Sequence, residues 1–389
     1  MIQKQYLRPV WAEINLDNLA YNVNQIRLYI GSNVRLMGVV KCNAYGMGMG
    51  IIRTLLDHGV DMLGVAILDE ALTIRKQDKV IPILVFGYTP FEYSYMLIKN
   101  NMTQTVYCIE QARALSLAAV ELNKKARIHI KIDTGMGRLG FQSGYDAIKN
   151  ISEIANMPNL ELEGIYTHCP YTNETAGKGK IFTDLQFKEF CQVVNTLQNK
   201  SITFDIKHVC NSLGTIYYKN MHMDMVRAGI ILYGSYPLFQ SVLPLKPVMS
   251  LRTKIGFIKK LLPCKNVSYG RTFITSRETI VATLPLGYGD GYNRLLTNKA
   301  EVLIRGNRVP VIGTICMDQC MVDITDIQEE CQIGEEVTLL GQQGQEEITI
   351  EELSQKICGF INYEYLVSIN CRVPRIYKKD CITVDKSYL

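Results

Sequence analysis

Short apolar runs alternate with segments of helical periodicity from about residue 35 to residue 235. Eight such runs are rich in Val, Ile and Leu, as buried parallel strands are: RLMGVV, MLGVAI, PILVFG, TQTVY, RIHIKID, LEGIYTH, IKHVCN and MVRAGIILYG. Eight strands, each followed by a helix, predict a (β/α)8 barrel. An open doubly wound sheet is the alternative, although it usually stops near about six strands.

The segments between the runs place their apolar residues on one helical face. Two of them carry Ala112, Leu115, Ala119 and Leu122, and Leu185, Phe190, Val194 and Leu197. A helix is also expected before the first barrel strand, with Leu19, Val23, Ile26 and Ile30 on its apolar face.

The pattern changes after residue 240, where strand-like runs are separated by glycine and polar turns. Only EELSQKIC is helix-like, and YLVSINCRVPRIY is expected to be strand. The opening VWAEINL is a strand without a place in the barrel. We therefore expect a barrel over 13–240 and a mostly-β domain over 241–389 that also takes the strand from residues 1–12.

Composition narrows the class of protein. The net charge of +5 is small and scattered, which disfavours nucleic acid and favours a small anionic ligand. No apolar run is long enough to span a membrane, and the N-terminus lacks the apolar region of a signal peptide. Twelve cysteines without a CxxC pair indicate a reducing cytosol. Cys316 and Cys320 could be metal ligands, but they have no nearby His or Cys partner.

Polar residues recur where the predicted strands end. Active sites of (β/α)8 barrels lie at that face. The residues are Lys41, Arg138, His168, Asn211, Ser212, Arg227 and Gly229. Any one of them could be a solvated loop residue, but together they predict a site at the barrel mouth.

The loops after the seventh and eighth strands commonly bind phosphate in this fold. Here they offer Ser212 and the backbone around Gly229 and Ile230. A phosphate there, with Lys41 across the mouth, suggests pyridoxal 5′-phosphate bound covalently to that lysine. Burial at a strand end favours a neutral, nucleophilic amine.

The whole chain resembles the alanine racemase family. The motifs are VVKCNAYG, HIKIDTGMGRLG, EGIYTH, NSLGT, DMVRAGIILYG, VSYGRTF, LPLGYGDGYNR, CMDQ and INYEY, in the family's order. The resemblance implies a cytoplasmic, pyridoxal-phosphate-dependent homodimer with shared active sites. It also implies interconversion of L- and D-alanine, which supplies a D-amino acid for peptidoglycan.

The resemblance also implies residue roles. Lys41 would hold the cofactor and act as one base, and Tyr269 of a second subunit would be the other. Phosphate would be bound by Tyr45, Ser212, Gly229, Ile230 and Tyr363. The remaining roles fall to Arg227 at the pyridine nitrogen, Arg138 at the phenolic oxygen, His168 between Arg227 and Tyr269, Met317 at the substrate carboxylate, Tyr288 at the entrance, and Lys131, which is often carbamylated in the family.

Racemisation itself favours this arrangement, because a proton leaves one face of a planar carbon and another returns to the opposite face. Arginine gives up a proton reluctantly, so a pyridine nitrogen facing Arg227 should remain unprotonated and transamination should be disfavoured. Aminotransferases place a carboxylate there instead.

Three positions depart from the family pattern, namely Met47, Thr314 and Asn173. The last two remove charge near the expected entrance, so serine could compete with alanine as substrate. A non-catalytic cofactor carrier and a decarboxylase on a similar barrel are further alternatives. The β domain that carries Tyr269 argues against a carrier.

Overall fold

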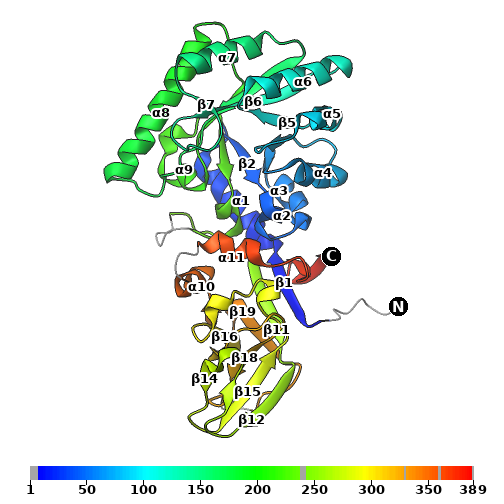
Figure 1. Ribbon diagram of the computed structural model, residues 1–389, viewed down its shortest axis with the longest axis vertical. Coiled ribbons are helices and arrows are strands. Elements are labelled where there is room, and N and C mark those ends of the chain that lie inside the picture. The colour runs from blue at the N-terminus through cyan, green and yellow to red at the C-terminus, as the bar shows by residue number, and fades with distance from the viewer. Residues whose placement is uncertain (1–7, 237–241, 328–329, 358–360, 388–389) are drawn as a thin grey trace.

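The computed structural model describes residues 8–236, 242–327, 330–357 and 361–387. The expected domain boundary at 240/241, residues 1–7 of the expected first strand segment and Cys358 of the expected EELSQKIC helix lie outside these ranges. Figure 1 shows an elongated molecule with a parallel barrel at one end and a mostly-β domain at the other. Helix α11 (Asn362–Ser368) lies between the two.

The barrel contains all eight predicted strands, and its ladders are parallel. They are β2 (Arg35–Val39), β3 (Met62–Val65), β4 (Ile83–Val85), β5 (Thr103–Val106), β6 (Ala126–Asp133), β8 (Leu160–Tyr166), β9 (Ile206–His208) and β10 (Met225–Ala228). β10 pairs with β2. The gap between β9 and β10 is bridged by backbone bonds from Arg227 N to Cys210 O (3.0 Å) and from Asp224 N to Lys207 O (3.1 Å). The predicted barrel is therefore confirmed as a nearly closed one.

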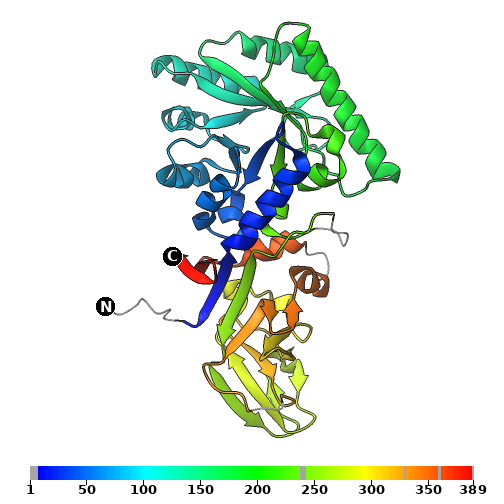
Figure 2. The same ribbon diagram turned by 180° about the vertical axis from the view of Figure 1, so that it is seen from behind.

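Helices cover the outside of the barrel (Figures 1 and 2). They are α1 (Leu16–Ile30), α3 (Ile52–Asp57), α4 (Leu68–Gln77), α5 (Ser94–Lys99), α6 (Ile109–Glu121), α7 (Tyr145–Ala155) and α8 (Gly177–Gln198), with the short α9 (Ser212–Tyr217) near the mouth. The predicted apolar face of α1 is buried. The predicted helix with Leu185, Phe190, Val194 and Leu197 is present as α8, but the placement of Leu185 on its buried face was wrong, because Leu185 is 52% exposed whereas Phe190 and Leu197 are buried. Leu185 is five residues from Phe190, and that spacing turns it away from the buried face of α8.

The C-terminal domain is built on a largely antiparallel sheet of eleven strands. They are β11 (Met249–Lys254), β12 (Phe257–Leu261), β15 (Thr279–Leu284), β16 (Glu301–Ile304), β17 (Asn307–Ile312), β18 (Cys320–Asp323), β19 (Glu336–Gln343), β20 (Glu346–Ile348), β21 (Arg375–Lys379), β22 (Ile382–Ser387) and β1 (Val10–Asn15). β1 lies between β11 and β21, as predicted for the opening strand. It then continues into α1 on the barrel, as Figure 2 shows.

One segment differs from the expected secondary structure. The run YLVSIN was expected to be strand, but Tyr365–Ser368 belongs to α11, while only the later part of the run forms β21. Tyr365 and Leu366 face the core and Val367 faces outward, a helical spacing that a segment of this length hardly reveals. The helix predicted in EELSQKIC is present as α10 (Ile350–Lys356).

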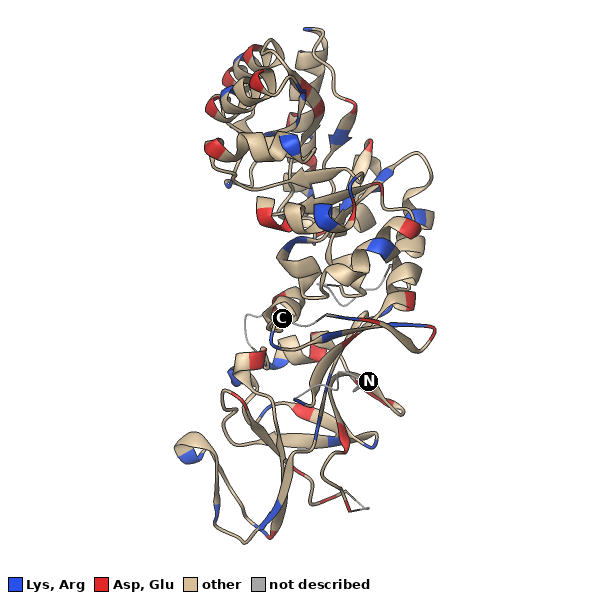
Figure 3. Cartoon of the chain, turned by 90° about the vertical axis from the view of Figure 1, so that its right-hand side faces the viewer, with Lys and Arg blue, Asp and Glu red and all other residues tan. Residues whose placement is uncertain are grey.

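In the view of Figure 3, basic and acidic residues are interspersed over both domains. Among the described residues, no helix combines the length and the apolar character needed to cross a membrane.

Candidate active site

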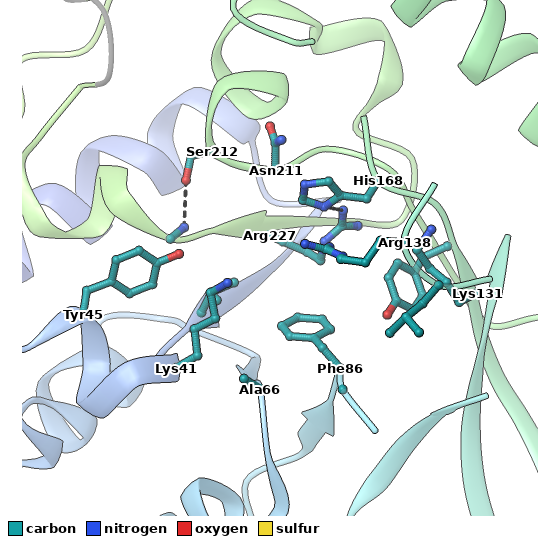
Figure 4. A pocket seen from close by; sticks show the side chains of 15 residues that line it. Lys41, Tyr45, Ala66, Phe86, Lys131, Arg138, His168, Asn211, Ser212 and Arg227 are labelled. Carbon is teal, nitrogen blue, oxygen red and sulfur yellow. Dashed lines mark hydrogen bonds between the residues drawn. The ribbon is translucent and has the colours of Figure 1, made fainter. Parts of the chain in front are cut away.

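A cavity of about 280 Å³ opens where the barrel strands end (Figure 4). It is lined by Val39, Lys41, Tyr45, Ala66, Phe86, Gly87, Lys131, Arg138, Leu139, Tyr166, His168, Asn211, Ser212, Arg227 and Gly229. The structure thus brings together, from five different strand ends, all seven residues that the strand-end pattern singled out.

One end of the cavity is suited to a phosphate. The backbone N–H of Gly229 donates to Ser212 Oγ at 2.9 Å. A Cβ at Gly229 would stand 2.7 Å from the Tyr45 hydroxyl oxygen, so only glycine fits this close approach. Burial raises the pKa of Tyr45 well above its ordinary value, so its hydroxyl keeps a proton to donate. Ile230, which follows Gly229, is buried.

Arg227 is buried on the floor of the cavity, and its hydrogen-bond partners in the described part of the chain are neutral. Its Nη2 donates to the carbonyl oxygens of Thr167 (3.0 Å) and Val209 (2.9 Å). Burial lowers the pKa of Arg227, but a guanidinium stays protonated in proteins. The ring of Tyr166 lies 5.2 Å from the guanidinium carbon and holds it from one side.

A chain of hydrogen bonds leads from Arg227 through two histidines to Glu163. Its donors and acceptors are determined, because Arg227 can only donate and an ionised Glu163 can only accept. Because a guanidinium only donates, His208 Nδ1 must accept from Arg227 Nη1 (3.0 Å) and carry its proton on Nε2. His208 Nε2 then donates to His129 Nδ1 (2.9 Å), and His129 Nε2 donates to Glu163 Oε2 (3.1 Å). Burial lowers the pKa of both histidines, so they are neutral and connect a cation to a carboxylate.

His168 completes the predicted contact with Arg227. Its Nδ1 lies 3.4 Å from Arg227 Nη2 and accepts from it, which leaves the proton on Nε2. Burial, and then the charge of Arg227, hold the pKa of His168 well below its ordinary value. The ring is therefore neutral and has one N–H left to donate.

Lys131 and Arg138 are two further basic residues that line the cavity. Lys131 Nζ donates to Ile132 O at 2.6 Å, and burial, then Arg227, lower its pKa to about 7. Within the described ranges Arg138 has no hydrogen-bond or ion-pair acceptor, although it lines the cavity. Figure 4 shows the two side chains next to each other at one side of the site.

Lys41 follows β2 and extends into the cavity (Figure 4). It is partly exposed in the single chain, so the burial expected for it is incomplete. It also borders a neighbouring apolar recess with Tyr45 and Tyr363 of α11. The rings of Tyr45 and Tyr363 lie 6.4 Å apart, edge to face, which brings the C-terminal segment to the barrel mouth.

The other three predicted residues lie on the β domain and do not line this cavity in a single chain. Tyr269 is 72% exposed, and Tyr288 and Met317 are also exposed. The backbone of Tyr269 is held by Thr314, whose Oγ1 donates to Tyr269 O at 2.8 Å. Thr314, one of the departures from the family pattern, thus supports the predicted base.

Sequence reasoning missed His208 and His129 and the apolar wall made by Phe86, Tyr166 and Leu139. Strand alternation contained the signal for one of them, because His129 and Lys131 are two residues apart on β6 and face the same side.

Cys316 and Cys320 were considered as metal ligands from the sequence. In the described part of the chain, no group of His, Cys, Asp and Glu side chains has the geometry to hold a metal ion. Cys320 is buried in the core of the β domain, and burial raises the pKa of its thiol.

Known proteins of one family match this chain over nearly its full length. Family models described as "Alanine racemase, N-terminal domain" and "Alanine racemase, C-terminal domain" match residues 14–237 and 248–377. "Alanine racemase 1" of Clostridium acetobutylicum is 44% identical over 380 residues, which is 97% of each chain. The solved alanine racemase of Clostridium difficile 630 superposes with a TM-score of 0.94 at 38% identity over 99% of each chain. That of Bacillus anthracis with bound L-Ala-P gives 0.92 at 34% over 99% and 98%.

Proposed function

The chain belongs to the alanine racemase family and is thus an amino-acid isomerase, and from that premise we propose that it works with pyridoxal 5′-phosphate at Lys41 and with Tyr269 of a second copy. The observation that carries this proposal is the cavity in which Lys41, Arg227 and the Ser212–Gly229 contact converge. The proposed division is a barrel over 13–240 and a β domain over 241–389 with the strand from 1–12.

The residues present fit the cofactor. Tyr45, Ser212 and the backbone of Gly229 and Ile230 provide donors at one end, where glycine leaves room for an anion. Arg227 would face the pyridine nitrogen, Arg138 the phenolic oxygen, and Tyr363 would close the phosphate end. When bound, the cofactor supplies an aldehyde for the substrate nitrogen and withdraws electrons from the α-carbon.

The chain's own groups then move the proton. Lys41 Nζ removes or returns the α-proton on one face, and Tyr269 Oη of the second copy does so on the other. His168 has its free N–H on Nε2, which is available to the Tyr269 oxygen. Arg227 can only donate, so it does not protonate the group it faces, and this favours racemisation over transamination.

The exposed position of Tyr269 supports the proposed homodimer. In the described part of a single chain, Tyr269 does not line the cavity, and Tyr269, Tyr288 and Met317 are exposed on the β domain. A second copy that docks its β domain over the barrel mouth would cover these apolar side chains and complete the site. The same copy would place Met317 at the substrate carboxylate.

Mixed dimers test the proposal. Lys41→Ala and Tyr269→Ala should each be inactive, but mixed in equal amounts they should recover up to about a quarter of wild-type activity, because half of the dimers are mixed and each has one intact site. The visible absorbance of lysine-bound pyridoxal should disappear in Lys41→Ala and remain in Tyr269→Ala. A wild-type chain that binds no cofactor, or mixtures without recovered activity, would contradict the proposal.

The product D-alanine would supply peptidoglycan, and the enzyme would work in the cytoplasm, as the family resemblance implies.

A further inference from the structure

The segment that follows Lys41 has a backbone conformation that side chains rarely adopt. Four successive residues other than glycine have positive φ: Cys42 (53°), Asn43 (53°), Ala44 (54°) and Tyr45 (53°). They form a left-handed turn, closed by a bond from Gly46 N to Cys42 O at 3.0 Å. Each Cβ in such a turn crowds the following carbonyl oxygen, so the turn persists only where its surroundings hold it.

The turn places the two ligand-facing side chains. Lys41 and Tyr45 are four residues apart, about one turn of helix, and both line the cavity. A right-handed turn after β2 would carry Tyr45 away from Ser212 and Gly229. The strain therefore coincides with the residues that the proposed function needs.

Glu70 holds the start of the turn. One carboxylate oxygen, Oε1, accepts from Cys42 N at 2.6 Å. The other, Oε2, accepts from Ala66 N at 2.9 Å and Ile67 N at 3.4 Å, at the beginning of α4. A single side chain thus ties the strained turn to the next strand end, where Ala66 also lines the cavity.

Arg375 of the β domain holds the end of the turn. It is only 4% exposed, and its Nε donates to Gly46 O at 2.9 Å. Its two other nitrogens donate to three carbonyl oxygens, those of Ile369, Asn370 and Val373, at 2.6–2.7 Å.

Two residues further along β21, Tyr377 supports the same segment. Its hydroxyl donates to Met47 O at 3.1 Å. A Cβ at Gly48 or Gly50 would come within 2.5 Å of the Tyr377 side chain, so the backbone packs directly on it. The strand next to β1 therefore fixes the position of the lysine loop of the barrel.

We propose that Glu70 and Arg375 are positioning residues that hold this left-handed turn and so direct Lys41 and Tyr45 into the cavity. Through Arg375, the C-terminal domain of the same chain contributes to the cofactor site. This contribution is separate from that of Tyr269, the base that a second copy supplies. The inference rests on the proposed function, because it assumes that Lys41 and Tyr45 bind pyridoxal phosphate.

Glycine provides the decisive test, since it adopts positive φ without the Cβ penalty. Glu70→Ala should weaken pyridoxal-phosphate binding at least tenfold, followed by the visible band during titration, and should lower kcat. Adding Cys42→Gly should recover at least severalfold of the lost affinity. Adding Cys42→Ala, which keeps the Cβ, should recover none. Glu110→Ala, a first-turn glutamate of α6 away from the site, is the matched control and should bind like wild type.

The outcomes distinguish a failure of the positioning role of Glu70 from a failure of the proposed function. Unchanged cofactor affinity in Glu70→Ala, or equal recovery by the glycine and alanine variants, overturns the positioning role while the proposed function stands. A wild-type chain without the visible band overturns the proposed function and this inference with it. Arg375→Lys gives a second measurement that should also weaken binding, and Cys42→Gly should do little for it, because the lost contact is at the other end of the turn.

Discussion

Lys131 should be a carbamylated lysine whose modification depends on its buried position. Burial and Arg227 lower its pKa from 10.5 to about 7. At pH 8 roughly 90% of such an amine is neutral, against roughly 0.3% of an ordinary lysine, so about 300 times more of it can attack carbon dioxide. The carbamate would provide the acceptor oxygens that Arg138 lacks in the described part of the chain.

The assay combines labelled bicarbonate with a stability measurement. With ¹³C-bicarbonate at pH 8, one carbamate resonance per chain should appear, and it should be absent in Lys131→Met. Lys125→Met, an exposed lysine at the turn before β6, is the control and should retain the resonance. The variant that cannot be carbamylated should leave Arg138 less ordered and should raise KM more than it lowers kcat.

The unmodified lysine also makes stability depend on pH, with a defined sign. In carbon-dioxide-free buffer the folded amine is neutral above about pH 7 while the unfolded amine is still protonated, so the unfolded chain binds more protons. The free energy of unfolding should therefore rise between about pH 7 and 10.5, by about 5 kcal/mol in total for this group, and should not change on its account below pH 7. Lys131→Met should lose this rise. An amine that titrates near 10.5, or a chain without the carbamate signal, would refute the reasoning.

Three further outcomes follow. Glu163→Gln removes the negative charge at the end of the hydrogen-bond chain behind Arg227, so His129 Nε2 would donate to a neutral amide oxygen instead of a carboxylate. It should cost about 1.5–3 kcal/mol of unfolding free energy and shift the pH profile of kcat, and an unchanged profile would show that the chain is only structural. Tyr269→Phe should suppress α-hydrogen exchange in heavy water from one alanine enantiomer far more than from the other, whereas equal loss would contradict a base on each face. Comparing kcat/KM for alanine and serine should favour alanine by about 10–200-fold, and a ratio near one would establish the broad-specificity alternative that Thr314 and Asn173 suggested.

The barrel could be predicted because its strands are buried on both sides, so each one appears as an apolar run with few polar residues. The residues at their C-terminal ends could be predicted for the same reason, since polar side chains directly after such runs are unusual. The helix at Asn362–Ser368 could not, because its second half belongs to the run YLVSIN, whose adjacent apolar residues show no helical spacing. Glu70 and Arg375 were not predictable either. Their role comes from contacts with backbone atoms far along the chain, and backbone contacts leave no trace in side-chain patterns.

The distribution of charge in the cavity supports an anionic occupant independently of any family resemblance. Lys41, Arg138 and Arg227 all line it, and none of the described lining residues is acidic. The carboxylate at the end of the chain behind Arg227, Glu163, is separated from it by two neutral histidines, so it compensates the charge only weakly. Buried positive charge of this kind is unfavourable unless a ligand neutralises it. A phosphate ester with a phenolic oxygen carries negative charge at both of its ends, which matches a cavity with donors around Ser212 and Gly229 at one side and Arg138 at the other.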